Sequence, residues 1–143
     1  MLAFDTNILF AACEATAPNH TRARGFLEAH RGDANVALCE LVLVELYLLL
    51  RNPTVVVHPL SATAAGGLIQ ALRQNPRWRL VEYAGVMDAV WARAGRDPFA
   101  RRRVIDLRLA LTLQHHGVTE FATVNTADFR DLGFHRVWNP LAG

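Results

Sequence analysis

The chain opens with MLAFDTNILF (residues 1–10), an apolar stretch that contains a single acid. Its first four residues have the character of a short buried strand, and Thr6 or Asn7 supplies a cap for a helix from Ile8 toward Ala15. Asp5 therefore stands where a buried strand ends and a helix begins. A strand followed at once by a helix is typical of the βαβ units that build parallel sheets.

The rest of the chain alternates in the same way. Further strands are predicted at 36–39, 78–83, 121–124 and, at the edge of the sheet, 135–138. Further helices are predicted after Asn19 and over 40–51, 61–75, 86–94 and 99–116, the last ending at Gly117 as a C-cap. Strands separated by helices imply right-handed crossovers, which predicts an α/β fold with a mostly parallel sheet of about four or five strands, covered on both faces.

Length and composition favour one domain, spanning residues 1–143. With 143 residues, 52% of them hydrophobic, the chain is long enough for a sizeable core and short for two domains. The most apolar run, Leu41 to Leu50, is interrupted by Glu45, so no membrane helix is expected, and the N-terminus lacks the basic region of a signal peptide. Cys13 and Cys39 form no CxxC motif and are interpreted as small buried residues of a cytoplasmic protein.

Three carboxylates interrupt stretches that otherwise have the composition of buried core. They are Asp5, Glu45 in LVLVELYLLL (41–50) and Asp106 in RVIDLRLAL (103–111). Acids are almost never buried without a partner, because an unpaired ionised carboxylate in apolar surroundings takes up a proton. A single divalent cation satisfies all three if they converge. The pattern therefore indicates a Mg²⁺ or Mn²⁺ site and metal-assisted phosphodiester chemistry.

The predicted topology brings further polar residues to the same edge of the sheet. Asp5 closes the first strand, while Asn125 and Asp128 follow the fourth, and ligands of parallel sheets bind beyond the carboxyl ends of the strands. Asp106 has a second interpretation, because Arg102 and Arg103 lie one turn away and offer a surface ion pair.

All 15 basic residues are Arg, against a modest net charge of +2. Guanidinium groups bind phosphate in a bidentate manner, so Arg101, Arg102 and Arg103 are candidates for nucleic-acid binding, although taken alone they are better explained as a solvated helix face. Trp78 is interpreted as a buried strand residue rather than a base-stacking one. The leucines around Glu45 exceed what one helix face needs, which indicates packing against a second copy or a partner helix.

Four motifs in this order resemble the PIN-domain ribonucleases, and above all the toxin component of VapBC toxin–antitoxin systems. They are FDTN at 4–7, LVEL at 43–46 before RNP at 51–53, IDL at 105–107, and TVNTADF at 123–129. The resemblance implies a three-layer α/β/α sandwich, a homodimer, and Mg²⁺-dependent endoribonuclease activity that cleaves RNA phosphodiester bonds with metal-activated water. It also implies a cognate antitoxin as partner, through which alone the toxin meets DNA.

The resemblance also assigns roles to individual residues. It implies that the acids Asp5, Glu45 and Asp106 hold the metal and that Thr6 and Asn7 orient Asp5. Many relatives carry an Asp at the position of Asn125, where this chain departs from the pattern. Either Asn125 binds the metal or its water through the amide carbonyl, or Asp128 supplies the fourth catalytic acid; Asp128 has the alternative role of capping the following turn.

Three other functions were compared with this interpretation. Haloacid-dehalogenase-type phosphatases need a second acid two positions after the first, where this chain has Asn7, and the chain contains no Lys. A PIN-like module that binds RNA or protein without catalysis is the main non-enzymatic alternative, against which the presence of all three acids argues. DNA nucleases of the same superfamily usually carry additional domains for which this chain has no room.

Overall fold

Five short strands form one parallel sheet in the structure, a computed structural model that describes residues 1–143. The strands are β1 (Leu2–Phe4), β2 (Val36–Cys39), β3 (Arg79–Val81), β4 (Glu120–Ala122) and β5 (Arg136–Trp138). Their order across the sheet is β3-β2-β1-β4-β5, and all four neighbouring pairs are parallel. The predicted parallel sheet is confirmed.

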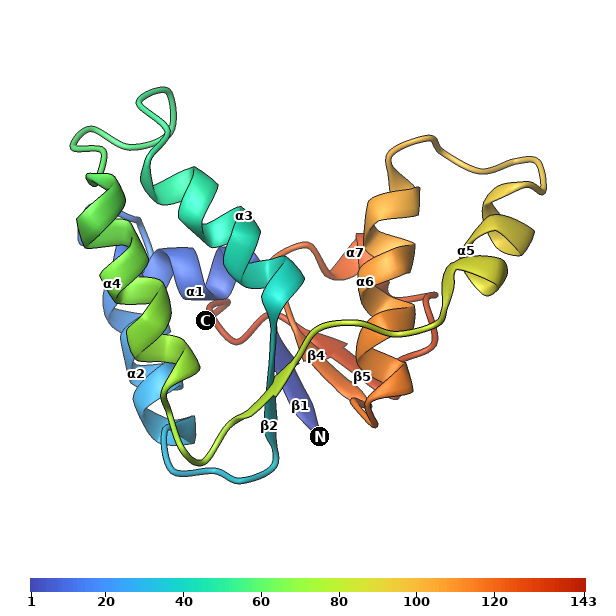
Figure 1. Cartoon of the computed structure of the whole chain (residues 1–143), viewed down its shortest axis with the longest axis horizontal. Helices are drawn as coiled ribbons and strands as arrows, with labels where there is room; N and C mark the ends of the chain where they lie inside the picture. The colour runs from blue at the N-terminus through green and yellow to red at the C-terminus, as the bar shows by residue number, and fades with distance from the viewer.

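Helices cover both faces of this sheet. They are α1 (Thr6–Cys13), α2 (His20–His30), α3 (Glu40–Leu50), α4 (Ala62–Arg73), α5 (Met87–Ala94), α6 (Arg103–His115) and α7 (Thr126–Phe129). Figure 1 shows α1 to α4 on one side of the strands and α5 to α7 on the other. The fold is therefore the predicted three-layer α/β/α sandwich. None of the helices has the length and apolarity needed to cross a bilayer.

The chain changes direction between β3 and β4. It first steps outward from β1 through β2 to β3, and then crosses back to β4 on the far side of β1. Because crossovers between parallel strands are right-handed, outward steps in opposite directions place their helices on opposite faces. The chain thus leaves the neighbouring strands β1 and β4 toward different faces, and parallel sheets bind their ligands at such a switch point.

The inner strands are buried on both faces, which explains their continuous apolar sequences. Beside them, Phe4 packs edge-on against Phe26 and Trp78, with ring centroids 5.5 and 5.6 Å away. The indole N–H of Trp78 donates to the carbonyl of His30 at 2.9 Å. Trp78 is therefore a packing residue, as predicted, but it is half-buried and lies just before β3 rather than within a strand. Both cysteines are free thiols.

Several predicted helix boundaries hold in the structure. Ser61 caps α4, its hydroxyl accepting from the amide of Ala64 at 3.1 Å. Gly117 follows α6 with φ of +90°, a conformation that favours glycine over other residues.

Two predicted helix starts are wrong, and one helix was not predicted. Asp5, rather than Thr6 or Asn7, caps α1, because its carboxylate accepts from the first helical amide. The last long helix begins at Arg103 instead of residue 99, because Phe99 packs against the core from a non-helical segment. The four-residue α7 was not predicted, since it is too short to show a periodicity.

Candidate active site at the carboxyl edge of the sheet

Asp5 is the buried centre of the candidate site. It follows β1 directly, and its side chain and backbone are only 7% exposed. One carboxylate oxygen, Oδ1, accepts from the amide of Thr6 at 2.8 Å. The N-terminus of α1 therefore binds this negative charge with a backbone donor and with the positive end of the helix dipole.

The second carboxylate oxygen of Asp5 is held by side chains from two elements. The hydroxyl of Thr123 donates to Oδ2 at 2.6 Å, and the amide group of Asn7 donates to the same atom at 3.3 Å. Asn7 is itself fixed across the sheet, because its carbonyl accepts from the amide of Val124 at 3.1 Å. The predicted role of Asn7 in orienting Asp5 thus agrees with these contacts, and the ends of β1 and β4 are joined by them.

Thr123 is the residue of this network that the sequence reasoning missed. It is completely buried, follows β4, and accepts a hydrogen bond from the amide of Asn125 at 3.0 Å while donating to Asp5. The signal that could have identified Thr123 is a hydroxyl residue at the carboxyl end of an otherwise apolar strand, two positions before Asn125. Its position mirrors that of Asp5, which follows the neighbouring strand.

Replacement of Thr123 tests how much this hydrogen bond contributes. We expect Thr123→Val to lower the free energy of unfolding by about 1–3 kcal/mol at neutral pH, because it leaves a buried carboxylate oxygen short of its closest donor. Thr123→Ser keeps the hydroxyl and serves as the control, and urea unfolding monitored by circular dichroism measures both. A Val variant as stable as the Ser variant would show that the contact contributes nothing.

Glu45 lies on α3 and is exposed, which corrects the expectation that it sits inside a buried stretch. The error arose because its neighbours along the helix do not all face inward: Val44 and Leu48 are each 60% exposed, whereas Leu46 is fully buried. The carboxylate nevertheless points toward the site, since its Oε2 accepts from the hydroxyl of Thr6 at 2.8 Å. Thr6 therefore contacts two acids, Asp5 through its amide and Glu45 through its hydroxyl.

Asp106 lies in the first turn of α6 and is half-buried. Desolvation, followed by the negative charges of Asp128 and Asp5 and more weakly of Glu45, raises its pKa from 3.8 to about 6. Asp106 forms no ion pair, so the alternative interpretation as a surface pair with Arg102 or Arg103 is wrong. Asp106 thus lies within the electrostatic influence of three acids from other parts of the chain, Asp5, Glu45 and Asp128.

The raised pKa of Asp106 predicts how stability depends on pH in the absence of metal. The folded protein binds more protons than the unfolded chain between about pH 4 and pH 6, so the free energy of unfolding falls as pH rises through this window and then levels off. Asp106→Asn removes this decrease in the free energy of unfolding. We therefore expect the variant to be more stable than the wild type at about pH 7.5 and equal to it at about pH 4. Because Asp106 is half-exposed, screening keeps the difference below about 1 kcal/mol.

Urea unfolding in EDTA at both pH values checks this expectation, with Asp88→Asn on the exposed surface of α5 as the control. If the Asp106→Asn variant were the less stable one at about pH 7.5, the carboxylate would be stabilised in the folded protein, contrary to the electrostatic account.

Asp128 and Asn125 lie in the short segment after β4. Asp128 is exposed on α7, where it contributes the largest charge effect on the pKa of Asp106, and its carboxylate makes no capping hydrogen bond. Asn125 precedes α7, and its side chain makes no hydrogen bond. Its backbone N–H donates to the hydroxyl of Thr123. Of the two candidates for the fourth position, Asp128 is thus the one whose charge acts on Asp106.

The donor chemistry of these side chains suits a hard divalent cation. No group of three or more His, Cys, Asp or Glu side chains is arranged so that it could hold a metal ion, so a direct three-carboxylate ligand set is not preformed. Mg²⁺ is commonly bound through one or two carboxylates and keeps several of its waters. The carboxylates of Asp5 and Asp106 fit that requirement, because the charge of Asp5 helps to raise the pKa of Asp106 and a cation relieves this repulsion.

The candidate arginines separate into two kinds. Arg101 and Arg102 are exposed and make no hydrogen bond or ion pair, which leaves them free for phosphate. Arg103 is bound to Asp131, with 2.6 Å between its Nη2 and the Oδ1 of the acid.

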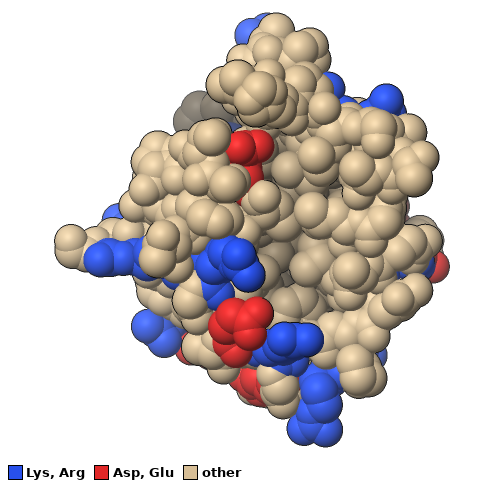
Figure 2. All heavy atoms as spheres, turned by 90° about the vertical axis from the view of Figure 1, so that its left-hand side faces the viewer, with Lys and Arg blue, Asp and Glu red and all other residues tan.

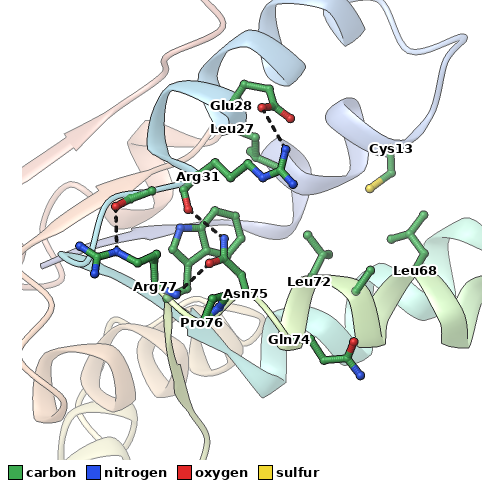
Figure 3. A pocket seen from close by; sticks show the side chains of 13 residues that line it. Cys13, Leu27, Glu28, Arg31, Leu68, Leu72, Gln74, Asn75, Pro76 and Arg77 are labelled. Atoms are coloured by element: carbon green, nitrogen blue, oxygen red, sulfur yellow. Dashed lines mark hydrogen bonds and ion pairs between the residues drawn. The ribbon is translucent and has the colours of Figure 1, made fainter.

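A separate pocket of about 720 Å³ lies between α2 and α4 (Figure 3). Leu27, Leu68 and Leu72 line it together with Trp78, as do Arg31 and Arg77. It contains none of the four acids of the candidate site, so we do not place the chemistry there.

Comparisons with known proteins agree with this architecture. A model of the PIN-domain family matches residues 2–135. Ribonuclease VapC24 of Mycobacterium tuberculosis, in strains H37Rv and CDC 1551, is 55% identical over 141 residues, which cover 99% of this chain and 97% of the relative.

Two solved structures share the fold. The structure of FitAB bound to an IR36 DNA fragment has a TM-score of 0.65 at 19% identity and covers 100% of this chain and 97% of that one. FitAcB from Neisseria gonorrhoeae has a TM-score of 0.64 at 22% identity, with 98% of each chain covered. The fold, the ordered acids and the identity over nearly the whole length lead to one conclusion: the chain belongs to the PIN-domain family, among the VapC-type ribonucleases.

Proposed function

We propose that this chain is a metal-dependent endoribonuclease that acts in the cytoplasm as the toxin of a VapBC-type toxin–antitoxin system. The observation that carries the proposal is the position of Asp5, buried at the switch point of the sheet and near enough to Asp106 that its charge, with those of Asp128 and Glu45, raises the pKa of Asp106. The 55% identity to a protein named a ribonuclease supports RNA as the substrate.

Mg²⁺ or Mn²⁺ is the proposed cofactor, with Asp5 and Asp106 as the principal ligands. When bound, the cation lowers the pKa of water and neutralises negative charge that grows on the phosphoryl oxygens during cleavage. Asp5 is the rigid member, since Thr6, Asn7 and Thr123 all donate to it. Asp106 is half-exposed on α6, where it is accessible to a hydrated cation that also binds the phosphate.

Glu45 and Asp128 come from helices on opposite sides of the sheet, α3 and α7 (Figure 1). Glu45 is fixed by the hydroxyl of Thr6, and its second oxygen is free to accept a proton from the attacking water or to orient it. Asp128 adds negative charge next to Asp106, which strengthens the attraction for a cation. Arg101 and Arg102, exposed before α6, supply the contacts to the RNA backbone.

An antitoxin and a second copy of the chain are the proposed protein partners, and the antitoxin is the proposed route to DNA. Val44 and Leu48 are 60% exposed on α3, beside a groove of about 450 Å³ that α3 forms with α4 and that Leu43 and Ile69 line. Figure 2 looks onto the side where α2 and α4 lie, and most of that surface is uncharged with scattered charges of both signs. Such a surface suits an apolar protein partner better than a phosphate backbone.

Expression of the chain with and without its genomic neighbour tests this function. We expect growth arrest and new RNA ends, mapped by sequencing, when the chain is expressed alone, and relief of both when the neighbour is present. The absence of new RNA ends would leave a binding module without catalysis as the function. If the purified chain eluted as a monomer alone and did not bind the neighbour, the proposed partners would be wrong.

A further inference from the structure

Arg103 is bound in a way that the neighbouring arginines are not. It is the first residue of α6, one turn before Asp106. Its two terminal nitrogens grip the carboxylate of Asp131, Nη2 at 2.6 Å from Oδ1 and Nη1 at 3.3 Å from Oδ2. Nη2 also donates to the backbone carbonyl of Asp128 at 3.1 Å. Both ends of the guanidinium fork are therefore occupied within the protein.

A second arginine reinforces the same point of attachment. Arg93 of α5 donates from Nη2 to the backbone carbonyl of Asp131 at 3.1 Å and lies 3.8 Å from its carboxylate. Asp131, in the turn after α7, thus receives guanidinium groups from α5 and α6 at once. Bidentate pairs between Arg and carboxylate fix geometry more strictly than a single contact does.

The helix that carries Asp128 depends on contacts of this kind. Four residues make up α7, too few for a helix to hold its own shape, and no side chain caps its N-terminus. Phe129 is buried and anchors one face of the turn. The carbonyl of Asp128 itself, on the side of Asp106, is fixed by Arg103.

We propose that Arg103 is a positioning residue of the nuclease: by binding Asp131 and the Asp128 carbonyl, it fixes α7 against α6 and holds the carboxylate of Asp128 opposite Asp106. The proposal rests on the proposed function and assigns Arg103 a role different from phosphate binding. Only 28% of the Arg103 side chain is exposed, and both of its terminal nitrogens already bind groups of the protein, whereas Arg101 and Arg102 are exposed and unpaired.

Paired variants test the proposal through kcat and KM on a short RNA in Mg²⁺. We expect Arg103→Gln and Asp131→Ala each to lower kcat about tenfold with little change in KM. The double variant is expected to be no slower than the single variants, because both substitutions remove the same contact between Arg103 and Asp131. Arg102→Gln gives the signature of a lost phosphate contact, which is a higher KM and a weaker dependence on salt. Arg31→Gln, which removes an exposed ion pair with Glu28 on α2, is the control for a harmless loss of an arginine.

Hydrogen exchange of the backbone amides over 126–131 provides a readout that does not depend on catalysis. We expect Arg103→Gln and Asp131→Ala to speed this exchange about two- to fivefold, and Arg31→Gln to leave it unchanged. The absence of metal-dependent cleavage would refute the proposed function. The hydrogen-exchange rates over 126–131 would still decide whether Arg103 positions α7. The inference is overturned if exchange over 126–131 stays at the wild-type rate in both variants, or if Arg103→Gln raises KM as Arg102→Gln does while Asp131→Ala cleaves normally.

Discussion

Asp5→Asn and Asp106→Asn are each expected to reduce the Mg²⁺-dependent cleavage of RNA by at least about a hundredfold. Each substitution keeps the size of the side chain and replaces a charged oxygen ligand by a neutral amide, so the loss falls on cation binding and on charge stabilisation during the reaction. Asp5→Asn has a second effect, the loss of a hydrogen bond within the site. The amide nitrogen of Asn, at either oxygen position, faces groups that are themselves donors: Thr6 at Oδ1, or Thr123 and Asn7 at Oδ2.

A fluorescent RNA substrate and thermal unfolding of each variant measure this expectation together. Asp88→Asn is the matched control, since Asp88 is an exposed acid in the first turn of α5, as Asp106 is an acid in the first turn of α6. Folded Asp5→Asn and Asp106→Asn proteins that cut RNA at the rate of the Asp88→Asn protein would refute the assignment of these two acids.

Removal of divalent metal is expected to abolish cleavage altogether, and either Mg²⁺ or Mn²⁺ is expected to restore it. The physical reason lies in the environment of Asp106. Desolvation, and then repulsion by the neighbouring acids, raises the pKa of this carboxyl group to about 6. A cation reverses this effect by favouring the charged carboxylates. Metal binding near pH 6 is therefore accompanied by proton release, and the metal affinity falls as pH drops below the pKa of Asp106.

Cleavage assays in EDTA, followed by readdition of each metal, measure the first part, and calorimetry in buffers of different ionisation enthalpy measures the proton release. Arg31→Gln, which lies just after α2 and away from the acids, is expected to require metal as the wild type does. Cleavage that persists at full rate in EDTA would exclude metal-assisted chemistry and would favour a mechanism carried by side chains alone.

The arrangement of the fold was largely predictable from the sequence. The buried strand and helix at residues 1–10, and the same alternation further on, predicted the parallel sheet because strands covered on both faces have continuous apolar sequences. The β2 strand was predicted with its exact bounds, Val36–Cys39. The order of strands was not predicted, since it depends on which strands pair across long distances in the chain.

The candidate site was predictable in its acids and less so in their surroundings. Asp5 is buried as expected, but Glu45 is exposed. This was not predicted, because a helix that is apolar on nearly every side, as α3 is, does not reveal from its sequence which face turns inward. Thr123 was missed because a hydroxyl residue after a strand is common and its partner Asp5 is 118 residues away. The binding of Arg103 to Asp131 was hidden for the same reason, since it joins residues 28 apart.

Calorimetric titration with Mn²⁺ tests most directly whether these acids share one cation. The account predicts a saturable site in the wild type and in Asp88→Asn, and the loss of that site in both Asp5→Asn and Asp106→Asn, although these two residues lie on different elements and 101 positions apart. Undiminished Mn²⁺ binding by either of the two variants would contradict it, because the two carboxylates could not then be ligands of the same ion.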